Sequence, residues 1–255
     1  MKFKPIRQDG FSLIELAIVL VIVALLSGGL MMTLSAQKDG IATSETQSRL
    51  QEAQEALLGY VAANGRLPCP ASPGTTGNES PPVGGLCTHP YTGLLPAITL
   101  GLTPTDPNGY LLDGWNNPIR YAVTTYNHAT FCPNGCFTTG SGVRNVWNGS
   151  VGTLLLAPDL QLCSTAVNIQ NPGAPNASCA PGTELTTNAV IVIFSRRPNG
   201  ATVPVRADEQ ANSDNDRVFV SHTLTSAGPN EFDDLVTWIS PNILYSRLIA
   251  AGRLP

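Results

Sequence analysis

The sequence predicts an α+β protein in which a long amino-terminal helix packs on an antiparallel β-sheet domain with long, disulfide-stapled loops. Three observations predict this class. An apolar run of about 22 residues begins at Phe11, which is the length of a membrane-crossing helix. Several later runs have the alternation or the apolar continuity of strands. Six cysteines, an even number, accompany segments rich in proline and glycine.

The apolar run, residues 11–32, predicts a helix that crosses a hydrocarbon core of roughly 30 Å. Lys2, Lys4 and Arg7 precede it, and basic flanks remain on the cytoplasmic side. We therefore expect a single-pass protein whose residues 64–255 lie outside the cytoplasm. An ordinary secretory signal is the alternative, but it is cut after the run at a small-x-small site.

Glu15 is the one charge inside this run, where a carboxylate costs several kcal/mol unless it is protonated, paired or near headgroups. With Gly10 and Phe11 it resembles the prepilin signature of type IV pilins and type II secretion pseudopilins. The shared features are a short basic leader, a Gly-Phe junction, a Glu five places after the Gly and a long apolar run. They make the match specific over this segment.

The resemblance implies how the amino terminus is processed and used. A prepilin peptidase would cut between Gly10 and Phe11, the new amino terminus of Phe11 would be N-methylated, and residues 1–10 would be a cytoplasmic leader that is removed. Glu15 would then act in assembly by meeting the amine of a neighbouring subunit.

The same resemblance implies partners and location. The partners would be the prepilin peptidase, other pilin-like subunits in a filament, and an inner-membrane assembly platform with its ATPase. The protein would lie in the bacterial inner membrane, with its carboxy-terminal domain in the periplasm, and then in a pseudopilus or pilus. The net charge is −4, and removal of three basic residues and one acid with the leader makes it −6. Nucleic-acid binding needs a basic face, so no nucleic-acid partner is expected.

The helix is expected to continue past the membrane run and to end near Ala63, so that it spans residues 11–63, about 80 Å at 1.5 Å per residue. Asn64-Gly65 and the following Pro68 are stop signals. Its second half should pack under the domain, because apolar side chains recur there at helical spacing. They are Ile41, Leu50, Ala53, Leu57, Leu58 and Val61.

Residues 64–255 are expected to form one globular domain. The expected strands are 119–124, 153–157, 189–195, 218–224 and 235–239, of which 189–195 is apolar enough to be central and buried on both faces. A final helix should begin after Ser240 with Pro241 in its first turn, stop at Gly252, and bury Leu244, Leu248 and Ala251.

A turn from Asp113 leads into the first of these strands. With Trp115 and Asn117 it resembles the Asp-x-Trp-Gly-Asn-Pro-x-x-Tyr segment of major-pseudopilin-like proteins. Asn116 stands where that family usually has Gly, and Gly114 occupies the unspecified position. We interpret the segment as a structural turn with a core tryptophan rather than as a site.

The cysteines of an exported chain predict disulfides. We expect sequence neighbours to pair, which is one of fifteen possible connectivities. Zinc is the rival, but no Cys-x2-Cys pair and no clustered histidines support it. The expected pairs are Cys69 with Cys87, Cys132 with Cys136, and Cys163 with Cys179.

The acid-rich segment 207–216 offers Asn212, Asp214 and Asp216 as alternating oxygen donors for calcium. Arg217 stands where an EF-hand needs its glycine, so that motif is absent. Some pseudopilins hold calcium in a loop late in the chain. We nevertheless favour a solvated loop, with calcium as the alternative and no other cofactor.

No enzyme signature is present, because the three histidines are scattered and the common nucleophile and metal motifs are missing. We therefore expect a structural subunit and not an enzyme. The first hypothesis is a major or minor pilin-like subunit of a type II secretion pseudopilus. The second is a minor type IV pilin for adhesion, motility or DNA uptake, and the third is a membrane-anchored periplasmic binding protein or enzyme.

Overall fold

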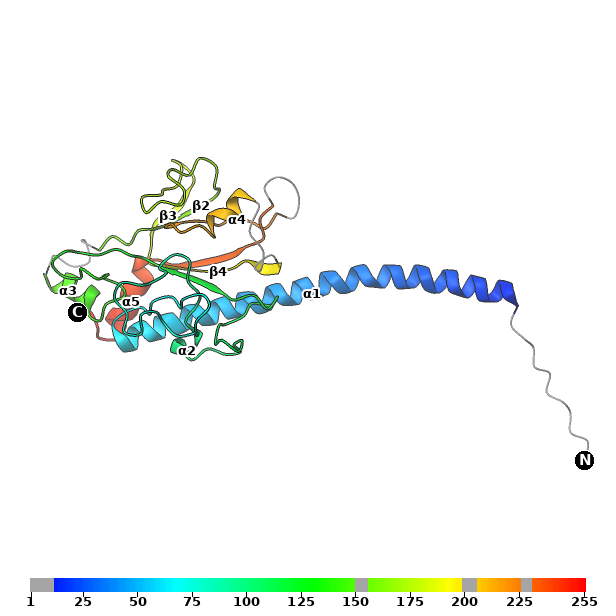
Figure 1. The fold of residues 1–255 in the computed structure, drawn as a ribbon, viewed down its shortest axis with the longest axis horizontal. Coiled ribbons are helices and arrows are strands. Elements are labelled where there is room, and N and C mark those ends of the chain that lie inside the picture. Colours follow the sequence, from blue (N-terminus) through cyan, green and yellow to red (C-terminus); the bar gives the residue numbers. More distant parts are fainter. Residues whose placement is uncertain (1–11, 150–155, 199–205, 226–230) are drawn as a thin grey trace, which may run out of the picture. The chain divides into compact units, whose positions relative to one another are not determined.

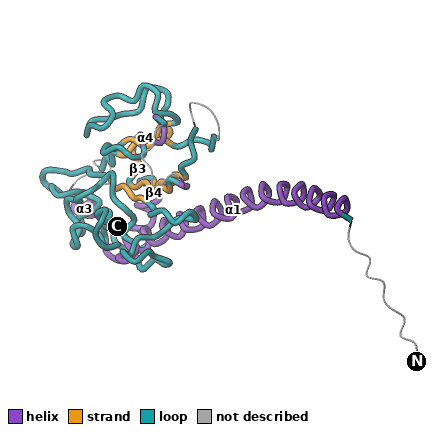
Figure 2. Tube along the Cα trace, turned by 45° about the vertical axis from the view of Figure 1, so that its right-hand side comes forward, coloured by secondary structure: helices purple, strands orange, loops and turns teal. Residues whose placement is uncertain are grey.

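The computed structural model of the protein consists of two units, Met1–Ala42 and Thr43–Pro255. The second unit contains all the strands of the described chain and most of its loops (Figure 2). The described residues are 12–149, 156–198, 206–225 and 231–255, with residues 26–36 described by their backbone only.

Helix α1, Leu13–Asn64, begins with a capping arrangement that its first residues encode. The N–H of Ile14 donates to Ser12 Oγ at 3.2 Å, and the N–H of Ser12 donates to Glu15 Oε2 at 3.0 Å. These reciprocal bonds form a capping box, which satisfies two backbone donors that the first turn of a helix leaves without partners.

The carboxy-terminal part of α1 packs as the sequence predicts, with one exception. The helix ends one residue beyond the predicted Ala63, and Gly65 follows with the left-handed φ of +69° expected of a helix stop. Ile41, predicted to lie on the buried face, is 68% exposed, because the compact unit begins only at Thr43. The buried residues of the predicted face are Leu50, Ala53, Leu57, Leu58 and Val61.

The predicted membrane segment, residues 11–32, is described only in part. Phe11 and the side chains of residues 26–32 lie outside the described part of the chain. Among the residues that are described, no helix combines the length and the apolar character needed to cross a membrane.

The first sheet has the strand order β1-β4-β6, with β1 at Arg120–Val123, β4 at Ile191–Ser195 and β6 at Leu235–Ile239. Both pairings are antiparallel. All five residues of β4 are buried, which confirms the prediction of a central strand covered on both faces.

The two faces of β4 contact different layers. Ile191 and Ile193 belong to the main core cluster, together with the buried face of α1. Val192 and Phe194 belong to a second cluster, with residues of the second sheet. The first sheet therefore lies between the carboxy-terminal part of α1 and the second sheet, as Figure 1 shows.

The second sheet is mixed. It has the order β3-β2-β5, with β2 at Leu160–Cys163, β3 at Glu184–Ala189 and β5 at Val218–Val220. Strand β2 pairs antiparallel with β3 and parallel with β5. The parallel pair departs from the expected antiparallel sheet. It is possible because the long connection from β2 to β5 passes through β3 and β4, and parallel neighbours need such a crossover.

Two of the predicted strands are not found over their predicted lengths. Of segment 153–157, residues 153–155 lie outside the described chain, and the described Leu156 and Ala157 are not in a strand. Segment 218–224 is a strand only over Val218–Val220.

Four further helices complete the described fold: α2 at Ala97–Leu100, α3 at Gly142–Gly149, α4 at Ala207–Ala211 and α5 at Pro241–Ala250. Only α5 was predicted. It starts after Ser240 and buries Leu244 and Leu248 as expected, whereas Ala251 is exposed. Gly252 follows with a φ of +66°, which fits its predicted role as the stop.

Disulfides staple three loops, and each joins the sequence neighbours that were predicted to pair. They are Cys69–Cys87, Cys132–Cys136 and Cys163–Cys179. The described chain has no free cysteine.

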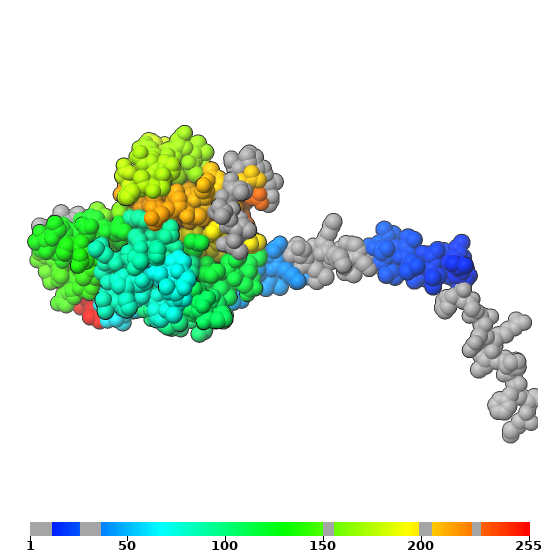
Figure 3. Space-filling model, viewed as in Figure 1, coloured from blue at the N-terminus to red at the C-terminus, as the bar shows by residue number. Residues whose placement is uncertain are grey.

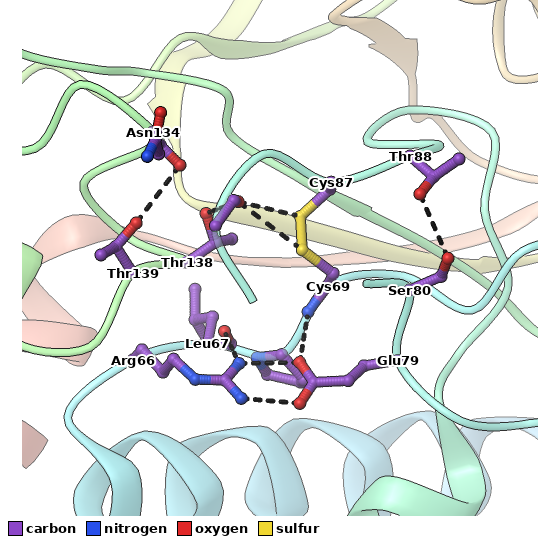
Figure 4. Close-up of a disulfide and its surroundings, with 12 residues drawn as sticks. Arg66, Leu67, Cys69, Glu79, Ser80, Cys87, Thr88, Asn134, Thr138 and Thr139 are labelled. Carbon is purple, nitrogen blue, oxygen red and sulfur yellow. Dashed lines mark hydrogen bonds and ion pairs between the residues drawn. A yellow bond between two sulfur atoms is a disulfide. The ribbon is translucent and has the colours of Figure 1, made fainter. Parts of the chain in front are cut away.

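The loop closed by Cys69–Cys87 is also held by a buried ion pair (Figure 4). Arg66 donates through both terminal nitrogens to the two carboxylate oxygens of Glu79, at 2.7 and 2.6 Å. The N–H of Cys69 donates to Glu79 Oε2 at 3.1 Å. This bidentate geometry is the strong form of the Arg–carboxylate bond, and it raises the pKa of Arg66. The pair ties Arg66, the second residue after α1, to the proline-rich loop.

Candidate functional site

The predicted processing and assembly residues lie at the start of the chain. Gly10 and Phe11 are outside the described residues, so the structure describes this region from Ser12 onward. Glu15 is exposed in the first turn of α1. Its carboxylate accepts the N–H of Ser12, which belongs to the peptide bond with Phe11. The carboxylate is therefore held one residue from the predicted new amino terminus.

The first turns of α1 expose apolar side chains. Every described residue from 12 to 25 is exposed, with Leu13 at 89% and Leu25 at 73%. A helix that is apolar all round has no polar face to offer water, and such surfaces mark membrane or protein contacts. None of the described side chains from residue 12 to residue 25 is buried.

The turn after Asp113 is built around that buried carboxylate, which is 1% exposed. Asp113 Oδ1 accepts the N–H groups of Trp115 at 2.9 Å and Asn117 at 2.8 Å. Its Oδ2 accepts the hydroxyl of Ser195, at the end of β4, at 2.6 Å. Asp113 thus fixes the turn and joins it to the central strand.

Asn116 has a φ of +65° in this turn. Glycine adopts such a left-handed conformation freely, and asparagine is among the few other residues that tolerate it. This explains why Asn116 can occupy the position at which the resembled family usually has Gly.

Trp115 is half-buried and is not part of the core, contrary to the prediction of a core tryptophan. The Arg197 guanidinium lies 4.6 Å from the centre of its ring, within cation–π range. The same guanidinium donates to Thr43 Oγ1 at 3.1 Å, and the N–H of Gly114 donates to Thr46 Oγ1 at 2.9 Å. The turn therefore fastens the start of the compact unit to the end of β4.

The acid-rich segment 207–216 is not the solvated loop that the sequence favoured. It contains α4, and most of its acidic and amide side chains are buried. The cause is the mixed second sheet, because α4 packs against β5 and turns this polar face inward. The buried side chains are Asp208, Glu209, Asn212 and Asp216.

Two of the three predicted calcium ligands, Asn212 and Asp216, form hydrogen bonds with backbone groups instead. Asn212 donates to Val220 O at 3.1 Å and to Asp234 Oδ2 at 2.8 Å, and its Oδ1 accepts the N–H of Val220 at 2.7 Å. Asp216 accepts two backbone N–H groups, each at 2.7 Å. Asp214 alone of the three keeps a carboxylate oxygen without a hydrogen-bond partner among the described residues. As a set, these three residues do not fit an ion that takes six to eight oxygens.

Three other acids do converge. Glu209 of α4 and Asp233 and Asp234 before β6 have carboxylate oxygens within 4.8 Å of one another. Burial raises the pKa of Asp233 to about 6 and that of Asp234 to about 7, and the charge of Glu209 adds to both shifts. The Oδ1 atoms of both aspartates have no hydrogen-bond partner in the described structure.

These donors fit a hard divalent cation better than the predicted set does, because carboxylate oxygens are the ligands that calcium prefers. Bound there, the ion would neutralise the repulsion among the acids. Arg196 and Arg197 oppose it, since their charges already lower the pKa values of Asp234 and Asp233. Sequence reasoning missed this trio because Glu209 lies far from the aspartates along the chain. The adjacent Asp233-Asp234 pair before a strand was the available signal.

His222, one of the three scattered histidines, follows β5. In the structure its Nε2 lies 3.1 Å from Asp208 Oδ2, its Nδ1 lies 2.8 Å from Thr223 O, and its ring packs on Phe232 at 4.1 Å between centroids. The ring is thus held between Asp208 of α4 and Phe232, which precedes β6. These contacts describe a structural histidine.

One comparison with known proteins gives a match. Residues 6–31 match a family model described as the prokaryotic N-terminal methylation motif. No curated protein and no solved structure gives a significant match to the chain. The match includes the junction of Gly10 and Phe11, the capping residue Ser12 and Glu15. Residues 6–31 thus carry the prepilin-type signature of type IV pilin-like proteins.

Proposed function

We propose that the protein is a structural, non-catalytic subunit of a type II secretion pseudopilus. The prepilin-type signature implies processing by a prepilin peptidase and assembly with other pilin-like subunits. In this proposal cleavage falls between Gly10 and Phe11 and Phe11 is N-methylated. The helix anchors the subunit in the bacterial inner membrane, with the domain in the periplasm, until an assembly platform and its ATPase add it to the filament.

The observation that carries the proposal is the coincidence of the motif with a bare apolar helix. The motif covers residues 6–31, and the described side chains of residues 12–25 are exposed apolar groups apart from Ser12 and Glu15. Such a surface needs a membrane or a bundle of similar helices around it. A membrane followed by a filament core supplies both environments in turn.

The choice of secretion over surface pili rests on the segment from Asp113 to Tyr121. Its resemblance to major-pseudopilin-like proteins extends to the left-handed Asn116, where Gly is usual. The second candidate, a minor type IV pilin for adhesion, motility or DNA uptake, is favoured by the large domain with three disulfides. The third, a membrane-anchored periplasmic binding protein or enzyme, has no such supporting feature.

Deletion of the gene discriminates among the three. The measurements are secreted exoproteins, surface pili and twitching, with the wild-type gene supplied on a plasmid as the control. Loss of secretion with intact pili is the expected result. Loss of pili with normal secretion would select the minor pilin, and normal behaviour in both assays would favour the third candidate.

We propose calcium as the one cofactor of the domain, bound by Glu209, Asp233 and Asp234. The support is the fit of these donors and the unpartnered Oδ1 atoms of the two aspartates. The ion's role would be structural, since it would join α4 to the start of β6.

A further inference from the structure

A hollow of about 440 Å³ lies between the loop closed by Cys163–Cys179 and helix α4. Two carboxylates hold the loop at either end of it. Asp208 Oδ1 accepts the N–H of Ala166 at 2.5 Å, and Asp216 Oδ2 accepts the N–H of Gly173 at 2.7 Å. Figure 3 shows the yellow-green surface of this loop next to the orange surface that includes α4. The hollow is therefore a preformed feature of the fold.

The lining of the hollow is part apolar and part polar. The loop contributes Ile169 and Pro172, and α4 contributes Ala207 and Ala211. Three polar side chains complete it: the amides of Asn168 and Gln210 and the carboxyl group of Asp214. The hollow thus combines an aliphatic wall with amide oxygens and one acid.

Asp214 has no cationic side chain as a partner among the described residues. Among the described residues it has no ion pair, and its Oδ1 has no hydrogen-bond partner. Burial and the neighbouring carboxyl group of Asp216 raise the pKa of Asp214 to about 7. Arg217 acts on Asp216 but lies 4.0 Å from Asp159, with which it forms an ion pair. A positive group in the hollow would stabilise the ionised Asp214.

The lining selects the kind of cation. Calcium needs six to eight oxygens, and a wall of alanine, isoleucine and proline does not provide them. A guanidinium gains most from a bidentate bond to a carboxylate or from an aromatic face. Asp214 offers Oδ1 as its buried oxygen without a partner, and the described lining has no aromatic ring. A lysine side chain has an aliphatic stem for the wall and a compact ammonium for the acid. We propose that the hollow binds a lysine side chain of a partner polypeptide.

The location of the hollow indicates which partner. Helix α4 packs on β5 of the second sheet, and the second sheet covers the face of the first sheet that is opposite α1. If α1 mediates assembly, as the proposed function states, this outer layer stays accessible in a filament. The partner is therefore a polypeptide that contacts the outside of the assembled subunit.

The test is a binding measurement on the full chain in detergent, with labelled isoleucine methyl groups observed by NMR. The probes are the capped tripeptides Ala-Lys-Ala and Ala-norleucine-Ala, which differ in the terminal charge. The lysine peptide should shift the Ile169 methyl signal saturably at pH 8, with an affinity at least about tenfold higher than that of the norleucine peptide. Its affinity should fall at pH 6, because Asp214 then gains a proton.

Asp214→Asn should reduce the affinity for the lysine peptide to that for the norleucine peptide. Gln210→Ala should lower the affinity for the lysine peptide by less. Glu52→Gln, at an exposed acid of α1, is the matched control and should bind normally. Equal binding of the two peptides, or an unchanged affinity in a folded Asp214→Asn, would overturn the proposal. Because the assay uses unassembled chains, its failure leaves the proposed filament role untouched, and failure of assembly would leave this binding in place.

Discussion

Glu15 has two candidate roles, one within its own helix and one between subunits. Within the helix its carboxylate accepts the N–H of Ser12, which stabilises the first turn by an amount typical of caps, about 1 kcal/mol. Between subunits it would pair with the amine that cleavage creates on Phe11, since a buried charge is tolerated only when it is paired. Glutamine separates these roles, because it caps a helix as glutamate does but carries no charge.

We predict that Glu15→Ala and Glu15→Gln are inserted, cleaved and folded but fail to enter filaments, and that Glu15→Asp enters them partially. The measurement is co-purification of tagged subunits with sheared filaments, beside an immunoblot for processing. Normal incorporation of Glu15→Gln would show that the charge is not needed and would leave helix capping as the role of Glu15. Normal incorporation of Glu15→Ala would show that assembly needs neither the charge nor the cap.

Asn116 provides a test of the turn that joins β1 to the central strand. Its φ of +65° costs most residues roughly 1–2 kcal/mol. Asn116→Ala should therefore lower the free energy of unfolding by about 1 kcal/mol, while Asn116→Gly should leave it within a few tenths of the wild-type value. Urea denaturation in detergent measures both. A wild-type midpoint for Asn116→Ala would contradict the left-handed turn.

The raised pKa values of Asp233 and Asp234 make stability depend on pH. Both values lie above the ordinary aspartate value near 3.9, so the folded state holds more protons than the unfolded state between about pH 4 and 7. Stability from these groups is therefore lost as the pH rises through that window. In chelator, the melting temperature should be lower at pH 8 than at pH 5, and Asp234→Asn should reduce the difference.

Calcium reverses this trend if the three acids bind it, because the ion favours their charged forms. At a hundred times its Kd, calcium adds about 2.7 kcal/mol to the free energy of unfolding. Thermal melts at pH 8 with calcium or chelator measure the effect. Asp234→Asn should abolish it and Asp214→Asn should not. The opposite result would restore the ligand set of Asn212, Asp214 and Asp216, and a melt insensitive to calcium would exclude both sets.

At the scale of elements, the disulfides are the most direct constraint on the loops. Peptide mapping without reduction should give three linked pairs and no free thiol. The Cys163–Cys179 loop has a separation of 16 residues, for which closure contributes about 3 kcal/mol. Replacing both cysteines with serine should lower the free energy of unfolding by about that amount. It should also loosen the packing of the loop against α4, where the hollow lies. Alkylated thiols in the purified protein would contradict this framework.

Some elements were predictable because their signals are local. Strand β4 is continuously apolar, β6 runs over the predicted 235–239, and α5 has its proline start and glycine stop. Strands β2 and β3 were missed for a physical reason. In β3 five of the six residues are exposed or half-buried, and β2 is only four residues long, so neither shows a clear period. The parallel pairing of β2 with β5 depends on tertiary contacts that no local pattern reveals.

The candidate sites also divide into those that local sequence predicts and those that depend on tertiary contacts. The amino-terminal signature and the cysteine pairing follow from residues close together in the chain. The acids Glu209, Asp233 and Asp234 meet only because α4 packs on β5 and β6 pairs with β4. Their burial also explains why the expectation of a solvated loop was wrong, since a loop's exposure depends on which layer it joins.

At the scale of the whole molecule, the chain combines an apolar helix start with a domain held together by its own core. The compact unit begins at Thr43, where Arg197 and the Asp113 turn fasten α1 to the sheets. The residues proposed for processing and assembly precede this point, and the calcium candidates and the hollow follow it. Substitutions in the two sets should therefore have separate effects. Those before Thr43 should affect assembly, and those after it should affect stability or binding.

The central claim is that cleavage leaves the apolar helix attached to the domain. Intact-mass and amino-terminal analysis of the membrane-extracted protein tests it most directly, with Gly10→Val as a control that should accumulate as the full-length precursor. We predict a mature chain that starts at N-methylated Phe11. An ordinary signal peptide would instead be cut after Leu34-Ser35-Ala36. A freely soluble chain that starts at Gln37, without the helix start, would contradict the account.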